Sequence, residues 1–267
     1  MQLVQAILFF LVSLTASVVG AICGIGGGVI IKPSLELLAA DGASTISFLS
    51  ACTVLAMSLF SVLRGLFSER GGTPRLRTCT PLAIGAVCGG VLGNLLFGMV
   101  RSMFTVSDKV GGIQAICLAV ITAGTFLYTL FKDKIRTRSL DGILPCLLIG
   151  LVLGIVSSFL GIGGGPINLV VLFYFFGMDT KSAAASSLYI ILFSQLANII
   201  TTVATASIPR FEWYILVLMI AGGIIGGIVG RGICAKIKSK TVDRLFLCLM
   251  VVIILISIYN SIRYLLL

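Results

Sequence analysis

The amino-acid sequence predicts an all-α protein that crosses a membrane several times and forms one integral-membrane domain over residues 1–267. Only 10% of its residues are charged and 58% are hydrophobic, whereas soluble domains carry about a quarter charged residues. Apolar stretches of about 20 residues, long enough to span a bilayer as helices, recur along the whole chain. The chain also repeats itself: we expect two homologous halves of four elements each, inverted relative to each other, with a glycine-broken first element in each half.

The first half, residues 1–131, begins with the broken element. An apolar stretch at 3–22 runs into the word GIGGG at 24–28, and a second apolar stretch follows it. Consecutive glycines cost about 1 kcal/mol each relative to alanine inside a helix and admit positive φ angles, so a helix should stop here and restart. The remaining segments expected in this half are 29–40, 44–66, 80–100 and 108–131.

A basic linker, residues 132–142, separates the halves, and residues 143–267 repeat the pattern. The word GIGGG returns 137 residues later, and three further anchors recur in the same order at offsets of 133 to 135 residues. Pro166 follows the second word, and proline is favoured at the first helical position. The segments expected in this half are 145–160, 166–177, 183–207, 212–233 and 242–266.

Glycines recur at every fourth position in the third span of each half. They are Gly85, Gly89 and Gly93 in the first half and Gly222, Gly226 and Gly230 in the second. This spacing lets helix backbones approach closely, so we expect these glycines to serve helix packing.

The basic residues indicate the topology. If the broken elements crossed the membrane fully, the 19 Lys and Arg residues would divide 10 against 9. If each broken element turns at its glycine word and returns to its starting side, they divide 14 against 5, in agreement with the positive-inside rule. We therefore expect re-entrant first elements, both termini outside the cytoplasm and inverted halves, an architecture common among alternating-access carriers. The spread of these charges over short loops also argues against a nucleic-acid-binding face.

The glycine words do not match nucleotide-binding motifs. The pattern G-x-G-x-x-G would need glycine in place of Val29 and Pro166, and no G-K-[ST] follows either word. Non-helical backbone at membrane depth persists only where protein or a watery cavity satisfies its polar groups. A helix that restarts there offers free N–H groups and a partial positive charge to an anion. We expect the two words to converge near the middle of the membrane and to bind a small anion; tight packing of a kinked helix is the alternative.

The candidate substrate-binding residues fall into three groups. Lys32, at a depth where a lysine costs about 2.5–3.5 kcal/mol, either balances an anion or snorkels to the interface. Asn168 could donate to an anion oxygen, and Gln195 either lines the pore or serves a helix contact. The remaining candidates are the glycines Gly24, Gly26, Gly27, Gly28, Gly161, Gly163, Gly164 and Gly165, and the small polar residues Ser50, Cys52, Thr53, Ser186 and Ser187. These small polar residues either line the pocket or hydrogen-bond to their own helix.

With these motifs the chain resembles the TauE/SafE sulfite-exporter (TSUP) family over essentially its whole length. The resemblance rests on the two GxGGG words, on Lys32 and Pro33 after the first, on Pro166 and Asn168 after the second, and on the glycine-rich third spans. It implies a multi-pass permease of the bacterial inner (cytoplasmic) membrane for small sulfur-containing anions such as sulfite, sulfonates or thiosulfate. Members of the family differ in what they carry, so the resemblance does not specify the anion.

The residues that are absent also bear on mechanism. The sequence contains no histidine and no acidic residue in the middle of a span, so neither an enzyme nor a proton-coupled carrier is indicated. We expect secondary transport by alternating access, driven by the membrane potential, which supplies about 2.3 kcal/mol per charge per 100 mV. We expect no cofactor and no metal, and the substrate anion and the lipid bilayer as partners; a homo-oligomer is left open. The alternative is a transporter or channel for another small anion or a cation, because broken helices also present carbonyl ends.

Overall fold

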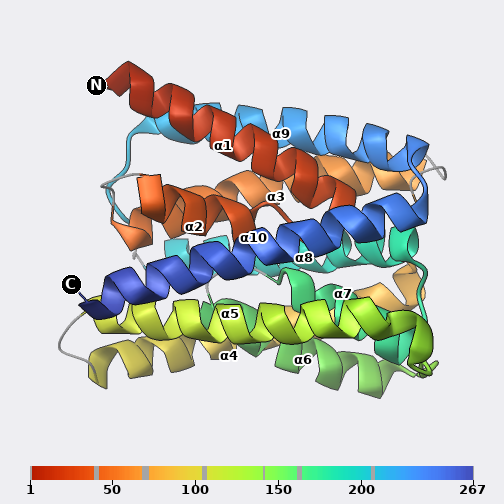
Figure 1. Ribbon diagram of the computed structural model, residues 1–267. Helices are drawn as coiled ribbons and strands as arrows, with labels where there is room; N and C mark the ends of the chain where they lie inside the picture. The colour runs from red at the N-terminus through yellow and green to blue at the C-terminus, as the bar shows by residue number, and fades with distance from the viewer. Residues whose placement is uncertain are drawn as a thin grey trace.

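The computed structural model describes residues 2–38, 42–67, 72–103, 107–140, 142–160, 164–205 and 208–266. Within these ranges the chain forms ten α-helices and a short 3₁₀ turn, and no strand (Figure 1). The first half contains α1 (Gln2–Cys23), α2 (Gly28–Leu38), α3 (Ala43–Phe67), α4 (Leu76–Met103) and α5 (Ser107–Phe131). After the turn η2 (Lys132–Lys134), the second half contains α6 (Ile143–Leu160), α7 (Pro166–Phe176), α8 (Thr180–Ala204), α9 (Trp213–Lys236) and α10 (Ser239–Leu266).

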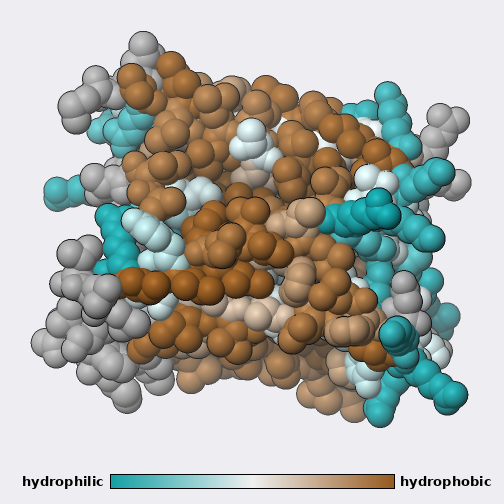
Figure 2. All heavy atoms as spheres, in the orientation of Figure 1, coloured by the Kyte–Doolittle hydropathy of each residue, from teal (hydrophilic) through white to brown (hydrophobic). Residues whose placement is uncertain are grey.

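These helices confirm the predicted all-α membrane fold. Eight of them, all except α2 and α7, are long and apolar enough to cross a membrane. Hydrophobic residues cover the middle of the molecule, and hydrophilic residues gather toward the helix ends, most densely at the right in Figure 2. The helix ends agree with the predicted segments to within a few residues.

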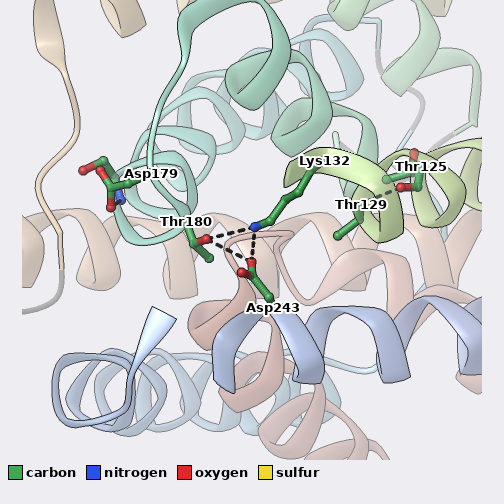
Figure 3. A network of polar contacts seen from close by, with 7 residues as sticks. Thr125, Thr129, Lys132, Asp179, Thr180 and Asp243 are labelled. Atoms are coloured by element: carbon green, nitrogen blue, oxygen red, sulfur yellow. Dashed lines mark hydrogen bonds and ion pairs between the residues drawn. The ribbon is translucent and has the colours of Figure 1, made fainter. Parts of the chain in front are cut away.

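Hydrogen bonds define one end of the bundle, which we call the linker end because residues 132–140, the described part of the basic linker, lie there. Lys132 after α5 forms an ion pair of 2.6 Å with Asp243 of α10, and its Nζ donates to Thr180 Oγ1 of α8 at 3.2 Å. Thr180 in turn donates to Asp243 at 2.9 Å (Figure 3). The Lys132 ammonium also lies 4.7 Å from the centre of the Phe173 ring of α7. Four helices are therefore tied together at this end.

The opposite end, which we call the terminal end, holds both chain termini (Figure 1). Near the start of α3, Thr45 Oγ1 donates to the Arg210 carbonyl ahead of α9 at 3.2 Å. Near the end of α10, Asn260 and Arg263 donate to the carbonyls of Pro33 and Glu36 of α2, at 3.4 and 3.2 Å. The close of α2 therefore lies at the same end as the start of α3 and the end of α10.

Both broken elements return to the end from which they start. In the second half, the N–H groups of Arg138 and Leu140, which precede α6, donate to the Tyr174 and Phe175 carbonyls at the close of α7, at 2.7 and 2.8 Å. In the first half, α1 starts at the terminal end and α2 closes there (Figure 1). The predicted re-entrant hairpins are thus present, and α1 and α6 enter from opposite ends. The relation of the halves by a two-fold axis, and the repeat boundaries at 1–131 and 143–267, stay predictions.

The glycines spaced four apart pack each hairpin onto a helix of the other half. A Cβ added at Gly89 of α4 would collide with the Leu151 carbonyl of α6, and one at Gly230 of α9 with the Val18 carbonyl of α1. Helix α4 thus lies on α6 as α9 lies on α1, and likewise α4 contacts α8 as α9 contacts α3. The predicted packing role of these glycines is confirmed.

The second hairpin also shows how local sequence sets helix ends. Pro166 occupies the first turn of α7, and Gly177 ends it in the left-handed conformation with φ +54°. Asp179 then caps α8 by accepting the Ser182 N–H at 3.2 Å. Partial burial raises the pKa of the Asp179 carboxyl, but hydrogen bonds from the Ser182 side chain and from the backbone N–H groups of Ser182, Asp179 and Lys181 together outweigh it and leave that pKa below its usual range.

Candidate functional site

The first glycine word is a break between two helices. Helix α1 ends at Cys23, and Gly24 and Gly26 adopt φ angles of +78° and +71° before α2 begins at Gly28. Residues other than glycine rarely adopt such φ angles, because their Cβ atom comes too close to the following carbonyl oxygen. The glycines at these positions therefore permit the reversal itself.

The second word has the same character where the structure describes it. Gly164 and Gly165 have φ angles of +124° and +75°, and Gly165 is the N-cap of α7. Two further candidates, Gly161 and Gly163, lie outside the described residues.

The two words meet on one side chain, Ile191 of α8. A Cβ added at Gly26 would lie 3.2 Å from Ile191 Cδ1, and one added at Gly164 would lie 3.1 Å from Ile191 Cγ1. Gly24 packs against the backbone of Ala184, two turns before Ile191 on the same helix. Residues 184 and 191 are seven apart and therefore share a helix face. Helix α8 thus lies against both words along a single face.

Several backbone N–H groups at the described positions of these words have no backbone acceptor. Among the described residues, no backbone carbonyl accepts from the N–H of Gly26, Gly28, Gly164 or Gly165. Gly27 is different: its nitrogen packs against Gly20 of α1, where an added Cβ would lie 2.7 Å away. The first turns of α2 and α7 therefore offer uncommitted donors and the positive ends of two helix dipoles.

Lys32 brings a positive charge to the second word. Its side chain extends from α2 and is only 8% exposed, and its Nζ lies 3.5 Å from the carbonyl of Leu160, the last residue of α6. This distance is at the long limit for a hydrogen bond. No carboxylate in the described part of the chain forms an ion pair with Lys32. The ammonium is buried rather than snorkelled to the surface. The carboxylate of Glu36, one turn further along α2, interacts with it electrostatically without forming an ion pair.

Three buried oxygen atoms of α7 and α8, the two helices that contact the second word, have no hydrogen-bond partner. They are Asn168 Oδ1 of α7 and Ser187 Oγ and Gln195 Oε1 of α8. Asn168 lies directly against Gly164, whose added Cβ would be 2.5 Å from the amide nitrogen, and Gln195 lies one turn beyond Ile191. A buried polar atom without a partner costs about 1–3 kcal/mol. An amide can rotate to present its NH₂ group to an acceptor, so these side chains suit a polar ligand.

The other small polar candidates are less directly placed. Ser50 is buried and Cys52 half-buried on α3. Thr53 donates to the Leu49 carbonyl of its own helix at 2.8 Å, which was one of the two predicted roles. Ser186 accepts the Arg75 N–H at 3.3 Å and so ties the residue before α4 to α8, a role that the sequence did not suggest.

Several residues that contact the words were not among the candidates. They include Ile191 and Ala184 of α8, and Ser17 of α1, whose buried Oγ has no partner and lies 3.3 Å from a Cβ added at Gly27. The spacing of Ala184, Ile191 and Gln195 along one face of α8 is the signal that could have identified Ile191. A metal site is not formed within the described ranges, since no three His, Cys, Asp or Glu side chains gather there.

The fold and this site define a membrane transporter built around two re-entrant hairpins. The family model described as Sulfite exporter TauE/SafE matches residues 9–256. The chain belongs to this family, and it is a transporter rather than an enzyme.

A curated relative agrees with this assignment. The chain is 24% identical over 276 residues to the "Probable membrane transporter protein YunE" of Bacillus subtilis (strain 168), covering 96% of this chain and 98% of that protein. No solved structure matches the chain significantly.

Proposed function

We propose that this protein is a secondary transporter that carries a small sulfur-containing oxyanion across the cytoplasmic membrane by alternating access. The anion binds between the two glycine words, against the free N–H groups of Gly26, Gly28, Gly164 and Gly165. The observation that carries the proposal is the contact of both Gly26 and Gly164 with Ile191. It brings two helix N-termini from opposite halves to one place, and such termini favour negative charge.

The charge near the site supports an anion over a cation. Lys32 places a buried ammonium 3.5 Å from the Leu160 carbonyl, which is the end of α6 that a cation would otherwise use. Broken helices bind cations through such carbonyl ends. With the ammonium facing that carbonyl, the remaining ligand groups are donors.

The architecture supports alternating access. Helices α1 and α6 enter from opposite ends, and each packs through glycines on α9 or α4 of the other half. Interfaces made of small residues have few interlocking side chains, so one half can tilt against the other. Such tilting exposes the anion first to one end and then to the other.

The membrane potential supplies the driving force. The described basic residues cluster at the linker end, so that end faces the cytoplasm under the positive-inside rule. An anion that leaves a negative interior gains about 2.3 kcal/mol per charge per 100 mV. The expected direction is therefore efflux.

A liposome assay tests the proposal. Purified protein is reconstituted, and uptake of sulfite, thiosulfate, sulfate and a small sulfonate is measured with and without an imposed potential. We expect flux of at least one of these anions to increase with the potential. Flux that ignores the potential, or that requires a proton gradient, would contradict the mechanism.

The substitution Lys32→Gln separates an anion pathway from a cation pathway. It should lower anion flux by about tenfold, the loss expected for one charge-assisted contact. The matched control is Lys240→Gln, which removes an exposed lysine at the start of α10 and should leave flux unchanged. Cation flux that rises in Lys32→Gln would favour the cation alternative.

A further inference from the structure

A second unpaired positive charge lies far from the glycine words, at the linker end of α9. Arg231 is only 3% exposed. Its Nη2 donates to the Gly72 carbonyl at 2.8 Å, and its buried Nη1 has no partner. The ion pair found among the described residues is that of Lys132 with Asp243, so no described carboxylate neutralises Arg231. A buried charge without a counter-charge is costly, and a bound anion would supply the counter-charge that the described residues do not. The carboxylate that is close to Gly72 in the sequence, Glu69, lies outside the described residues.

A second arginine lies beside it, across the seam between α3 and α9. Arg64 of α3 donates through Nη1 to the Ile228 carbonyl of α9 at 3.1 Å. A Cβ added at Gly65 would lie 3.0 Å from Arg231 Nη2, and one at Gly232 would lie 3.7 Å from Arg64 Nη2. Each guanidinium group therefore lies beside the residue that follows the other arginine, so the two groups are neighbours although like charges repel each other. Arg64 is exposed, so this place is open to the linker end.

The seam also holds an unused hydroxyl. Ser61, one turn deeper on α3, is 1% exposed, and its Oγ has no partner. It lies 3.0 Å from a Cβ added at Gly227 of α9. Two cations and a free hydroxyl thus line the same helix contact.

The corresponding seam of the other half contains a neutral pair among its described side chains. There, between α4 and α8, Asn94 Nδ2 donates to Asn198 Oδ1 at 3.2 Å. In the predicted repeat, Asn198 is the counterpart of Arg64. At the position of Arg64 this seam therefore carries an asparagine whose oxygen is satisfied by a neighbouring side chain, whereas the Nη1 of Arg231 in the α3–α9 seam has no partner.

We propose that Arg231 and Arg64 form a second anion-binding site, which takes a small oxyanion at the linker end of the α3–α9 seam. Guanidinium groups match oxyanions because their N–H donors form paired hydrogen bonds with two oxygens. The oxyanion bridges the arginines and relieves their repulsion. It is either a free anion, which the site concentrates at one mouth of the transporter, or the phosphate of a lipid headgroup. The use of sulfate as a probe rests on the proposed function, but the site itself does not.

Binding of sulfate to purified protein tests the site. Melting temperature is followed in a neutral detergent while sulfate replaces chloride at constant ionic strength. Arg231→Gln and Arg64→Gln should each weaken the apparent sulfate affinity about tenfold, the effect of losing one charge-assisted contact. The matched control Arg77→Gln, which changes an exposed arginine at the same end, should bind as the wild type does.

Two further variants keep the test decisive. In Lys32→Gln, which weakens the central site, the sulfate effect that depends on Arg231 should persist. If Arg231→Gln does not fold, Arg231→Lys keeps the charge but loses the paired geometry, and it should bind sulfate several-fold more weakly. The proposal is overturned if sulfate affinity stays at the wild-type value both in Arg64→Gln and in whichever single Arg231 variant folds.

The source of the oxyanion is distinguished in lipid nanodiscs. If the native ligand is a headgroup, phosphatidylglycerol in place of phosphatidylcholine should weaken sulfate binding in the wild type but not in Arg231→Gln. If the ligand is a free anion, the lipid has no such effect. In that case Arg231→Gln raises the KM for transport when the anion is supplied at the linker end, and it leaves the KM unchanged when the anion is supplied at the terminal end.

The two proposals fail in different ways. Absent flux with intact Arg231-dependent sulfate binding removes the transport proposal and leaves this site. Normal flux with unchanged sulfate binding in the Arg64 and Arg231 variants removes this site and leaves transport.

Discussion

Replacing Gly26 with alanine separates a binding role of the glycine word from a purely structural one. At φ +71°, alanine costs about 1–2 kcal/mol, and its smaller freedom in the unfolded chain offsets about 0.4–1 kcal/mol of that. The new methyl lies 3.2 Å from Ile191 Cδ1 and 3.5 Å from Val54 Cγ1. These neighbours are the ends of side chains that can shift by a few tenths of an ångström. The net loss of stability should therefore be about 1 kcal/mol, or 2–4 °C in melting temperature.

The loss of transport should be much larger, because the methyl lies against Ile191, the side chain on which both words pack. The backbone N–H remains, but if the methyl displaces the anion from it, the loss of one contact to a charged ligand costs about 1.5–3 kcal/mol, so flux at limiting anion concentration should fall tenfold or more. Flux in liposomes and melting in detergent are measured on the same preparation. The matched control is Gly124→Ala in α5, where nothing lies within 4 Å of an added Cβ. Wild-type flux in Gly26→Ala would refute the anion site at the glycine words.

Three further substitutions test the α4–α6 packing, the Lys132–Asp243 ion pair and the cap of α8. Gly89→Ala forces a methyl against the Leu151 carbonyl; the overpacking should cost about 1–3 kcal/mol, and an unchanged melting temperature would contradict the α4–α6 packing. Asp243→Asn removes the ion pair with Lys132 and should cost about 1–2 kcal/mol, read as a lower melting temperature that high salt no longer changes. Asp179→Ala removes the α8 cap and should cost about 0.5–2 kcal/mol. Because the folded-state pKa of Asp179 is lowered, this contribution is present above the usual Asp pKa and disappears as the pH falls through the folded value, so the variant and wild type should converge in acid.

Much of the fold follows from local chemistry and charge. The glycine words mark the breaks because three glycines disfavour a helix, and Pro166 begins α7 because its ring suits a first helical turn. The re-entrant course was predictable from the distribution of Lys and Arg alone, since only that course places most of these residues on one side of the membrane. The packing of the glycines spaced four apart followed from their small size.

The side-chain partners across the halves could not be predicted. Lys32 meets the carbonyl of Leu160, which is 128 residues away in the chain, and hydropathy periodicity contains no information about such a contact. Ser186 looked like a pocket residue because it is small and polar within an apolar span, but its hydroxyl accepts the Arg75 N–H. Ile191 escaped notice for the opposite reason: an isoleucine in a membrane helix is unremarkable until two glycine breaks are placed against it.

The packing of α1 on α9 has a consequence for biosynthesis. Val18 and Gly230 contact each other although about 210 residues separate them in the chain. At translation rates of about 5–20 residues per second, α1 waits roughly 10–40 seconds in the membrane before its partner emerges. For most of that interval α8, which packs against the first glycine word, has not been made either. Of the helices that cover the first hairpin, only α3 is available early, so an insertion chaperone that shields the remaining surface until the second half has been inserted would serve the newly made chain.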